Sequence, residues 1–324
     1  MARQRSTSVS LRTFLLACTV LVCLSGMVQP ALVPGKWFDR IIIFMFENTA
    51  YTDAIADTNF KYFASLGVLF TSYTGVTHPS QPNYIAMTSG NTFTTDDNNI
   101  NINASNIADL LDNKGVSWKV YAEDFPGNCN TSAQVGNYYR KHNPFISYDN
   151  IHSSTARCAN IVEAGQLDTD LSGTLPQYMY YVPNINNDGH NTNVGYAGNF
   201  IRTYMSTRQT KFPSRTLFYF TWDEDDNTPA NHIATIMFSQ GNLTLVGTTD
   251  GSAYNHYSLL RLVEDNWSLG NLGRSDATAN AISPVNFGIG TTITTSSVTT
   301  ATGSSSSSSP ASSLRGSSFL SFLL

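Results

Sequence analysis

The chain has few charged residues and no excess of basic ones. Only 13% of its 324 residues are Asp, Glu, Lys or Arg, and 18 basic against 23 acidic residues give a formal net charge of −5. A protein that binds a polyanion needs a basic surface, so this balance argues against nucleic acid as the main ligand. No interior apolar run reaches the ~20 residues of a transmembrane helix, so we expect no transmembrane span. The hydrophobic fraction of 41% nevertheless suffices for a large core, which excludes a wholly disordered chain.

The N-terminal segment indicates the localisation of the protein. Three arginines precede a short apolar run at residues 14–24, and small residues follow it. This pattern is typical of a secretory signal peptide. A membrane anchor is the alternative, but the run is too short to span a bilayer comfortably. We therefore expect residues 1–26 to be a signal peptide and the protein to be secreted.

Cysteine is also scarce. Two of the four cysteines lie in the N-terminal segment, which leaves Cys129 and Cys158. In an oxidising compartment these two are expected to form a disulfide. Four Asn-x-Ser/Thr sequons agree with secretion and predict N-glycosylation. They begin at Asn103, Asn130, Asn242 and Asn266.

The C-terminal residues 291–324 differ in composition from the rest of the chain. Fifteen of the 20 residues from 291 to 310 are Ser or Thr, so we expect a disordered tail with nothing to bury. The apolar end at 319–324 is similar to a GPI-anchor signal, although it is shorter than the usual ~10–20 residues. GPI or cell-wall attachment and a free secreted tail therefore both stay open.

Residues 27–290 contain no linker and no repeat, and we expect them to form one folded domain. Several apolar runs of strand length are continuous rather than alternating, which predicts a mostly parallel sheet covered on both faces. These runs are 40–46, 117–121, 177–182, 216–222 and 232–238. Residues 105–114 and 257–267 have the pattern of helices. The expected class is α/β, with helices on both sides of the sheet.

Acidic groups follow three of these apolar runs. They are Glu47-Asn48, Asp188-Gly189-His190 and the cluster 223–226. In open parallel sheets, ligands bind beyond the carboxyl ends of the strands, where these groups would converge. A single such cluster could simply cap a helix or a turn. Three clusters favour a functional site.

Oxygen donors at these strand ends suit a divalent metal ion. The candidate ligands are Glu47, Asn48, Asp223 and Glu224. Their carboxylates would neutralise the ion and place it against a phosphoryl oxygen. Three histidines could complete the metal shell, stabilise phosphate charge or transfer protons. They are His190, His232 and His256.

A further segment, residues 75–87, carries a candidate nucleophile. Pro82 suits the first turn of a helix, with Ser80 or Gln81 at the cap. A serine there faces free backbone N–H groups and the positive end of the helix dipole, where a phosphate would dock. A plain helix cap is the alternative. A neighbouring metal ion would favour the nucleophile, because it lowers the pKa of the hydroxyl.

Five short motifs occur in the order found in one protein family. They are Phe46-Glu47-Asn48, the segment 77–84, Asn187-Asp188-Gly189-His190, the segment 221–224 and the segment 255–260. Over residues 38–270 the chain resembles the phosphoesterase family of secreted acid phosphatases and non-haemolytic phospholipases C. Asp225-Asp226 and the Ser-rich tail look most like the fungal acid phosphatases.

The resemblance implies that residues 27–290 are a catalytic domain with an alkaline-phosphatase-like, three-layer α/β/α sandwich. It implies one divalent ion on the four oxygen-donor residues above, with Ser80 as the nucleophile. It also implies catalytic roles for Asp188, His190 and His256. His232 and His78 are expected to bind the phosphate of the substrate, although His78 could instead support its own loop.

These features predict a secreted, metal-assisted acid phosphatase that hydrolyses small phosphate monoesters through a phosphoserine. Either His190 or His256 would protonate the leaving alcohol, and cationic histidines would favour acid pH. A phospholipase C-type phosphodiesterase is the alternative enzyme, although the sequence shows no lipid-binding module. The alternative outside enzymes is an inactive secreted surface protein of the same fold. A sulfatase is disfavoured because no Cys-x-Pro-x-Arg segment is present.

Overall fold

The computed structural model describes residues 31–240, 246–284 and 288. Their centre is a nine-stranded sheet in the order β10-β2-β9-β8-β1-β7-β3-β6, with β11 paired to β2. The strands are β1 (Arg40–Phe46), β2 (Val68–Thr74), β3 (Trp118–Ala122), β6 (Ile161–Glu163), β7 (Tyr178–Val182), β8 (Thr216–Trp222), β9 (His232–Ser239), β10 (Thr248–Asp250) and β11 (Tyr254–Asn255). Within this nine-stranded sheet of the described residues, β9 pairs antiparallel with β2 and β8, and the other pairs are parallel. The α/β class with a mostly parallel sheet is confirmed.

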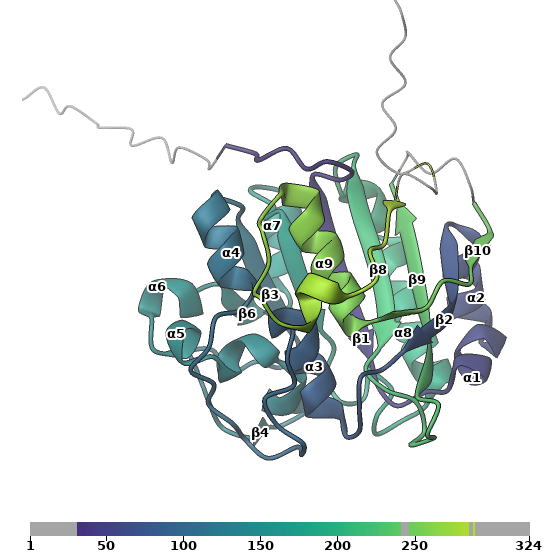
Figure 1. The fold of residues 1–324 in the computed structure, drawn as a ribbon, viewed down its shortest axis with the longest axis horizontal. Helices are drawn as coiled ribbons and strands as arrows, with labels where there is room; N and C mark the ends of the chain where they lie inside the picture. Colours follow the sequence, from purple (N-terminus) through teal and green to yellow (C-terminus); the bar gives the residue numbers. More distant parts are fainter. Residues whose placement is uncertain (1–30, 241–245, 285–287, 289–324) are drawn as a thin grey trace, which may run out of the picture. The chain divides into compact units, whose positions relative to one another are not determined.

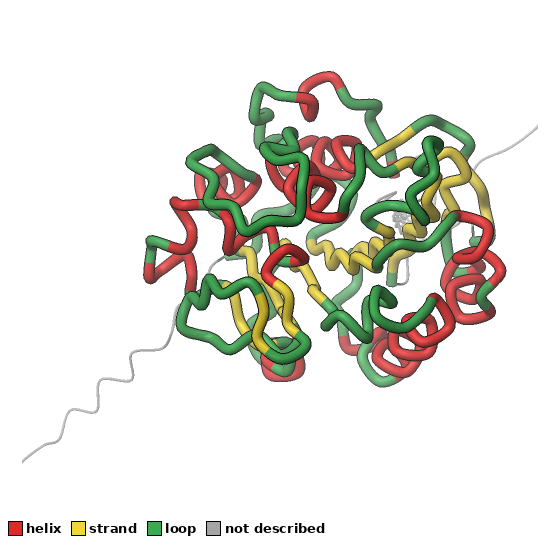
Figure 2. The backbone as a smooth tube through the Cα atoms, turned by 90° about the horizontal axis from the view of Figure 1, so that it is seen from below, coloured by secondary structure: helices red, strands yellow, loops and turns green. Residues whose placement is uncertain are grey.

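Helices cover both faces of this sheet, which Figures 1 and 2 show from two directions. One layer contains α1 (Tyr51–Ala56), α2 (Thr58–Ser65) and α8 (Val194–Ser206), and α2 packs on both α8 and β9. The other layer contains α3 (Ser80–Ser89), α4 (Ile107–Lys114) and α9 (His256–Trp267), and α9 packs on both α3 and α4. The three-layer arrangement therefore agrees with the prediction.

Short elements complete the described part of the chain. They are β4 (Gln134–Val135), β5 (Tyr138–Tyr139), α5 (Asp149–His152), α6 (Thr155–Cys158), α7 (Gln166–Leu171) and the 3₁₀ turns η1 (Arg140–His142), η2 (Pro144–Ser147), η3 (Gln209–Lys211) and η4 (Ser275–Thr278). Most of them lie in the long connection between β3 and β6. Cys129 and Cys158 are joined there by a disulfide, as the count of cysteines predicts.

The central strands explain why their sequences are apolar without alternation. Every residue of β7 and β8 is buried, because helices cover both faces of the sheet. Phe44 on β1 stacks on Tyr181 of β7 with ring centroids 4.6 Å apart, and meets Phe220 of β8 edge-on at 5.2 Å. Aromatic pairs of this kind each contribute about 0.5–1.5 kcal/mol beyond the area that they bury. The central strands are thus a rigid base for the loops at their ends.

Two helices begin where side-chain caps define their first turns. Asn106 caps α4 and Asn255 caps α9, each in a reciprocal capping box. Such caps satisfy backbone N–H groups that have no partner within the helix. The helices predicted at 105–114 and 257–267 therefore agree with the structure to within two residues.

Three sequence predictions concern the surface and the ends. The predicted signal peptide, the tail from 291 onward and the sequon at Asn242 lie outside the described residues. Asn103 is exposed and Asn130 is half-buried. Asn266 is different: its side chain is 2% exposed, accepts from Trp37 N at 2.9 Å and donates to Phe38 O at 2.9 Å. The prediction of a glycan at Asn266 is therefore wrong for the folded protein, because this amide is part of the core.

None of the described helices is both long and apolar enough to cross a membrane.

Glu264 on α9 is a buried carboxyl group that faces Asp276 in η4. Burial, and then the charge and hydrogen bond of Asp276, raise the pKa of Glu264 to about 9 from an ordinary value of 4.5. The folded protein therefore holds this proton at neutral pH, whereas the unfolded chain releases it. The stability contributed by this group is full below pH 4.5 and is lost as the pH rises toward 9, by about 1.4 kcal/mol per pH unit.

We expect Glu264→Gln to flatten this part of the pH dependence, since glutamine cannot ionise and keeps an N–H donor for Asp276. The free energy of unfolding, measured in urea at pH 5 and pH 8, should differ less in the variant than in the wild type. A pH slope equal to that of the wild type would contradict the assignment.

Candidate active site

The register of two central strands brings the first and the third acidic motifs together. Phe46 of β1 lies directly opposite Trp222 of β8 in a parallel pair, so the next residues, Glu47 and Asp223, leave the sheet side by side. Asp223 N donates to Phe46 O at 3.0 Å, and Asn48 N donates to Asp223 Oδ1 at 3.2 Å. The predicted convergence at the carboxyl edge of the sheet is therefore present.

Ser80 is the first residue of α3 and points at these acidic groups. Pro79 occupies the cap position, and no side chain caps the helix. The alternative of a plain serine cap is therefore wrong. Ser80 Oγ instead lies 3.0 Å from Glu47 Oε2, 3.1 Å from Glu224 Oε1 and 3.4 Å from Asn48 Oδ1. The helix start thus delivers a hydroxyl to the centre of the acidic cluster.

This cluster suits a divalent cation. A hydroxyl has one proton, so Ser80 cannot satisfy all three acceptors that surround it. Asp223 Oδ2 is also buried without a hydrogen-bond partner. Buried carboxylates that lack donors are costly unless a cation pairs with them, and oxygen atoms are the ligands of hard divalent ions. Glu47, Asn48, Asp223 and Glu224 are therefore a fitting ligand set.

The raised pKa values of the carboxyl groups also indicate that a cation would stabilise this cluster. Burial raises the pKa of Glu47, and the charges of Asp223 and Asp188 raise it further. Burial and the charge of Glu224 likewise raise the pKa of Asp223. Lys141 is the cation that partly opposes these effects at Glu47. Its ammonium group is held 2.8 Å from Asp97 Oδ2, so it belongs to a neighbouring ion pair.

His78 contacts the site through Glu224. Its Nδ1 bonds to Glu224 Oε2, and its Nε2 lies 3.1 Å from the carbonyl of Thr228. The side chain is 27% exposed. His78 therefore orients a candidate metal ligand and also borders the solvent, where a phosphate would enter.

His190 and Asp188 lie beside the cluster but differ in exposure. His190 is exposed, and its Nδ1 lies 2.9 Å from Asn191 Oδ1. Asp188 is 1% exposed, and burial raises its pKa to about 7. Its Oδ1 accepts from His190 N at 2.8 Å. Asp188 thus supports the loop that carries His190, and its catalytic role stays a prediction.

The two remaining predicted histidines contact groups other than Ser80 in the described structure. His256 is fully buried, its Nε2 lies 2.7 Å from Asp223 O, and burial lowers its pKa to about 4. The expectation that His256 is a cationic proton donor at acid pH therefore disagrees with the structure; the residue supports the backbone of Asp223. His232 stacks on Tyr51 at 4.3 Å, and its Nε2 lies 3.0 Å from Thr71 O. Its contacts place it outside the cluster around Ser80.

The sequence interpretation missed His142. This residue ends η1, is 1% exposed and lies between two acidic motifs. Its Nε2 is 3.1 Å from Glu47 Oε1 and its Nδ1 is 3.0 Å from Asp188 Oδ2. No strand end or acidic motif marks this position in the sequence. Its one signal was that only six histidines occur in the chain.

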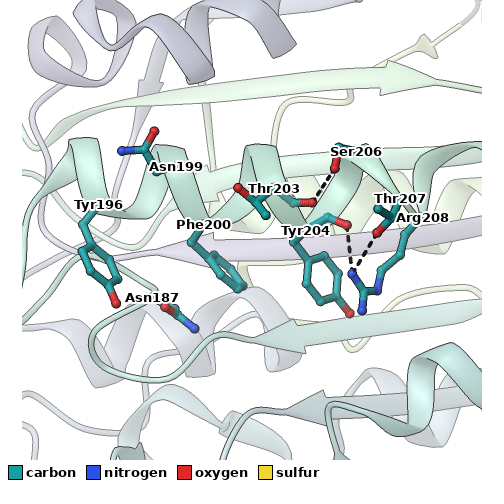
Figure 3. A pocket seen from close by; sticks show the side chains of 9 residues that line it. All are labelled: Asn187, Tyr196, Asn199, Phe200, Thr203, Tyr204, Ser206, Thr207 and Arg208. Atoms are coloured by element: carbon teal, nitrogen blue, oxygen red, sulfur yellow. Dashed lines mark hydrogen bonds between the residues drawn. The ribbon is translucent and has the colours of Figure 1, made fainter.

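A separate groove of about 600 Å³ runs along α8. Figure 3 shows Tyr196, Phe200 and Tyr204 on one side of the helix, with the Arg208 side chain beside Tyr204. None of the predicted site residues lines this groove. The candidate site is therefore the cluster at the carboxyl edge of the sheet.

Comparisons with known proteins identify the family of the chain. The Phosphoesterase family model matches residues 49–270. The chain is 37% identical over 269 residues to an acid phosphatase of Aspergillus fumigatus, covering 78% of this chain and 60% of that protein. It is also 37% identical over 268 residues to a probable acid phosphatase of Kluyveromyces lactis, covering 78% and 64%. The chain thus spans less than two thirds of the length of these relatives.

The solved structures extend the comparison to the fold. A protein of the alkaline phosphatase superfamily from Vibrio parahaemolyticus matches with a TM-score of 0.52 at 13% identity, over 80% of this chain and 74% of that one. At this identity the match concerns the fold alone. It confirms the alkaline-phosphatase-like fold that the sequence motifs predict.

Proposed function

The chain belongs to the Phosphoesterase family, and on that premise we propose that it is a metal-assisted phosphatase that hydrolyses small phosphate monoesters. The observation that carries the proposal is the position of Ser80. Ser80 is the first residue of a ten-residue helix, and its hydroxyl lies within 3.4 Å of oxygen atoms of Glu47, Asn48 and Glu224. A helix start favours a bound phosphate, and the oxygen donors favour a cation beside it.

The chain's own residues would carry out two displacements at phosphorus. Ser80 Oγ forms a bond to phosphorus while the bond from phosphorus to the alcohol oxygen breaks. Glu47 Oε2 at 3.0 Å and Glu224 Oε1 at 3.1 Å are the nearest carboxylate acceptors for the hydroxyl proton. A divalent ion on the ligand set would supply Lewis-acid chemistry, lowering the pKa of the hydroxyl and drawing charge from the phosphoryl oxygens.

His190 is the proposed donor of the proton that the leaving alcohol takes. It is exposed at the edge of the site, whereas His256 is buried behind Asp223. Water then cleaves the phosphoserine, which releases inorganic phosphate and restores the hydroxyl. Because the step needs a protonated imidazole, we propose an acid pH optimum.

Secretion is part of the same proposal. The segment 1–26 would direct export, and the Ser/Thr-rich tail would remain free or carry a GPI or cell-wall attachment. Sequons at Asn103 and Asn130 lie at positions with surface exposure. The disulfide between Cys129 and Cys158 agrees with an oxidising compartment.

A comparison of two substrate classes tests the activity. We expect the purified full chain with Mg²⁺ or Mn²⁺ to release phosphate from a small aromatic phosphate monoester, faster at acid than at alkaline pH, since the proposed donor must carry a proton before it can transfer one. Phosphatidylcholine vesicles should yield no phosphocholine under the same conditions. Faster release of phosphocholine would favour the phospholipase C-type reaction, and no hydrolysis of either substrate would favour an inactive surface protein.

A further inference from the structure

We propose that His142 is a positioning residue that fixes the orientation of Glu47, so that one carboxylate oxygen faces Ser80 and the cation. The inference rests on the proposed function for the identity of the site. It concerns a residue that has no assigned role in that function.

The first support is the position of His142. The ring is fully enclosed and stacks on Tyr84, with centroids 5.2 Å apart and planes 8° from parallel. Its two nitrogen atoms each lie at ion-pair distance from a different buried carboxylate, 3.1 Å from Glu47 and 3.0 Å from Asp188. His142 Nε2 and Asp188 Oδ2 have no hydrogen-bond partner in the described structure. The ring is therefore held in place by packing, within 3.1 Å of both acids.

The second support is that the two carboxylate oxygens of Glu47 face different partners. Oε1 accepts from the Tyr84 hydroxyl and lies beside His142 Nε2. Oε2 faces Ser80 Oγ at 3.0 Å. A carboxylate is planar, so holding one oxygen fixes the direction of the other. Tyr84 and His142 therefore hold Glu47 on the side away from the reaction.

The third support is that Asp188 contacts both the backbone of Glu47 and the ring of His142. Its backbone carbonyl accepts from Glu47 N at 3.0 Å, and its carboxylate lies beside His142 Nδ1. Asp188 thus fixes the main chain of Glu47 directly and its side chain through His142. Outer partners of metal ligands commonly change metal affinity by about 10–100-fold when they are removed.

A second reading uses the same atoms. Glu47, His142 and Asp188 each offer one ligand atom, and these atoms lie within 4.8 Å of one another. If His142 were itself a ligand, a second cation would bind there. The number of ions bound per chain separates this reading from a positioning role.

The test measures metal binding without substrate. We expect metal-free wild-type protein, titrated with Mn²⁺ in a calorimeter, to bind one ion per chain. His142→Ala should still bind one ion but about 10–100-fold more weakly. His142→Gln should recover part of the loss, because its amide N–H reaches toward Glu47 as Nε2 does. His142→Asn, which reaches only toward the Nδ1 position, should not.

Matched controls separate positioning from general destabilisation. Tyr84→Phe removes the other group that holds Glu47 and should also weaken Mn²⁺ binding, even if the His142 variants do not fold. Tyr148→Phe removes a buried hydroxyl that bonds to Thr88 on the same helix, 2.7 Å away, and should leave the affinity unchanged. His152→Gln removes a histidine on α5 and should also leave it unchanged.

Three results would overturn the proposal. They are two ions per wild-type chain with one lost in His142→Ala, unchanged affinity in both His142→Ala and Tyr84→Phe, and a wild-type chain that binds no Mn²⁺. Metal binding as expected in a protein that hydrolyses no phosphate ester would instead contradict the proposed function and leave the role of His142 intact.

Discussion

Replacing Ser80 with alanine is expected to abolish phosphate release, with a loss of at least about 10³-fold in kcat. The hydroxyl is the proposed nucleophile. The neighbouring carboxylate and amide oxygens cannot replace it, because none of them can form the same phosphoserine bond. The wild type, quenched with acid during turnover of a ³²P-labelled monoester, should carry label on Ser80. The variant should carry none.

A matched substitution on the same helix controls for loss of a buried hydroxyl. Ser89 Oγ donates to Ile85 O at 2.9 Å at the other end of α3, away from the acidic cluster. We expect Ser89→Ala to cost about 1 kcal/mol of stability and to leave kcat nearly unchanged. Substantial turnover by Ser80→Ala would mean that water attacks phosphorus directly.

Asp223→Asn is expected to keep the stability of the metal-free protein and to lose most of the stability that metal binding adds. In the absence of metal, Asp223 is a fully buried carboxyl group whose pKa is raised by burial and by Glu224. A neutral amide of the same shape removes this repulsion, so the metal-free variant should be at least as stable as the metal-free wild type. The same change removes a charged ligand, so the variant should bind the divalent ion weakly.

Thermal unfolding with and without Mn²⁺ measures both effects. An ion at 100 times its Kd stabilises the folded state by about 2.7 kcal/mol, and this gain should largely disappear in Asp223→Asn. Turnover should fall with it, by about 10²-fold or more, because charge at the phosphoryl oxygens is no longer offset.

Asp226→Asn is the control, since this residue is exposed and lies three positions after Asp223, at the end of the acidic cluster 223–226. Its metal-dependent gain in stability and its turnover should stay close to those of the wild type. If Mn²⁺ stabilised Asp223→Asn as much as the wild type, Asp223 would not be a metal ligand.

The candidate site was largely predictable because its residues follow strands that are easy to recognise. Continuous apolar runs identify β1 and β8, and the acids directly after them must leave the same edge of the sheet if the strands are parallel. The structure adds that Phe46 and Trp222 are neighbours in register. A shift of the register would separate Glu47 from Asp223, and no feature of either strand alone excludes such a shift.

The histidines were less predictable because their roles depend on depth rather than on spacing. His190 and His256 each lie in a recognisable motif, yet one is exposed and the other is fully buried. Burial disfavours the imidazolium, so the two cannot share the role of proton donor. His142 lies in the connection closed by the disulfide, where the sequence shows no periodic pattern.

The sequence by itself determined the class of fold, and it predicted the oxygen-rich ligand set and Ser80 as the nucleophile, because each follows from residue types and from their positions at strand and helix ends. Tertiary structure alone decided which groups share the site: the register of β1 and β8, the approach of α3 and the enclosure of His142 between Glu47 and Asp188. The physical reason is that side-chain chemistry and local propensity act within a few residues. Distance, burial and electrostatic coupling depend on segments that are far apart in the chain.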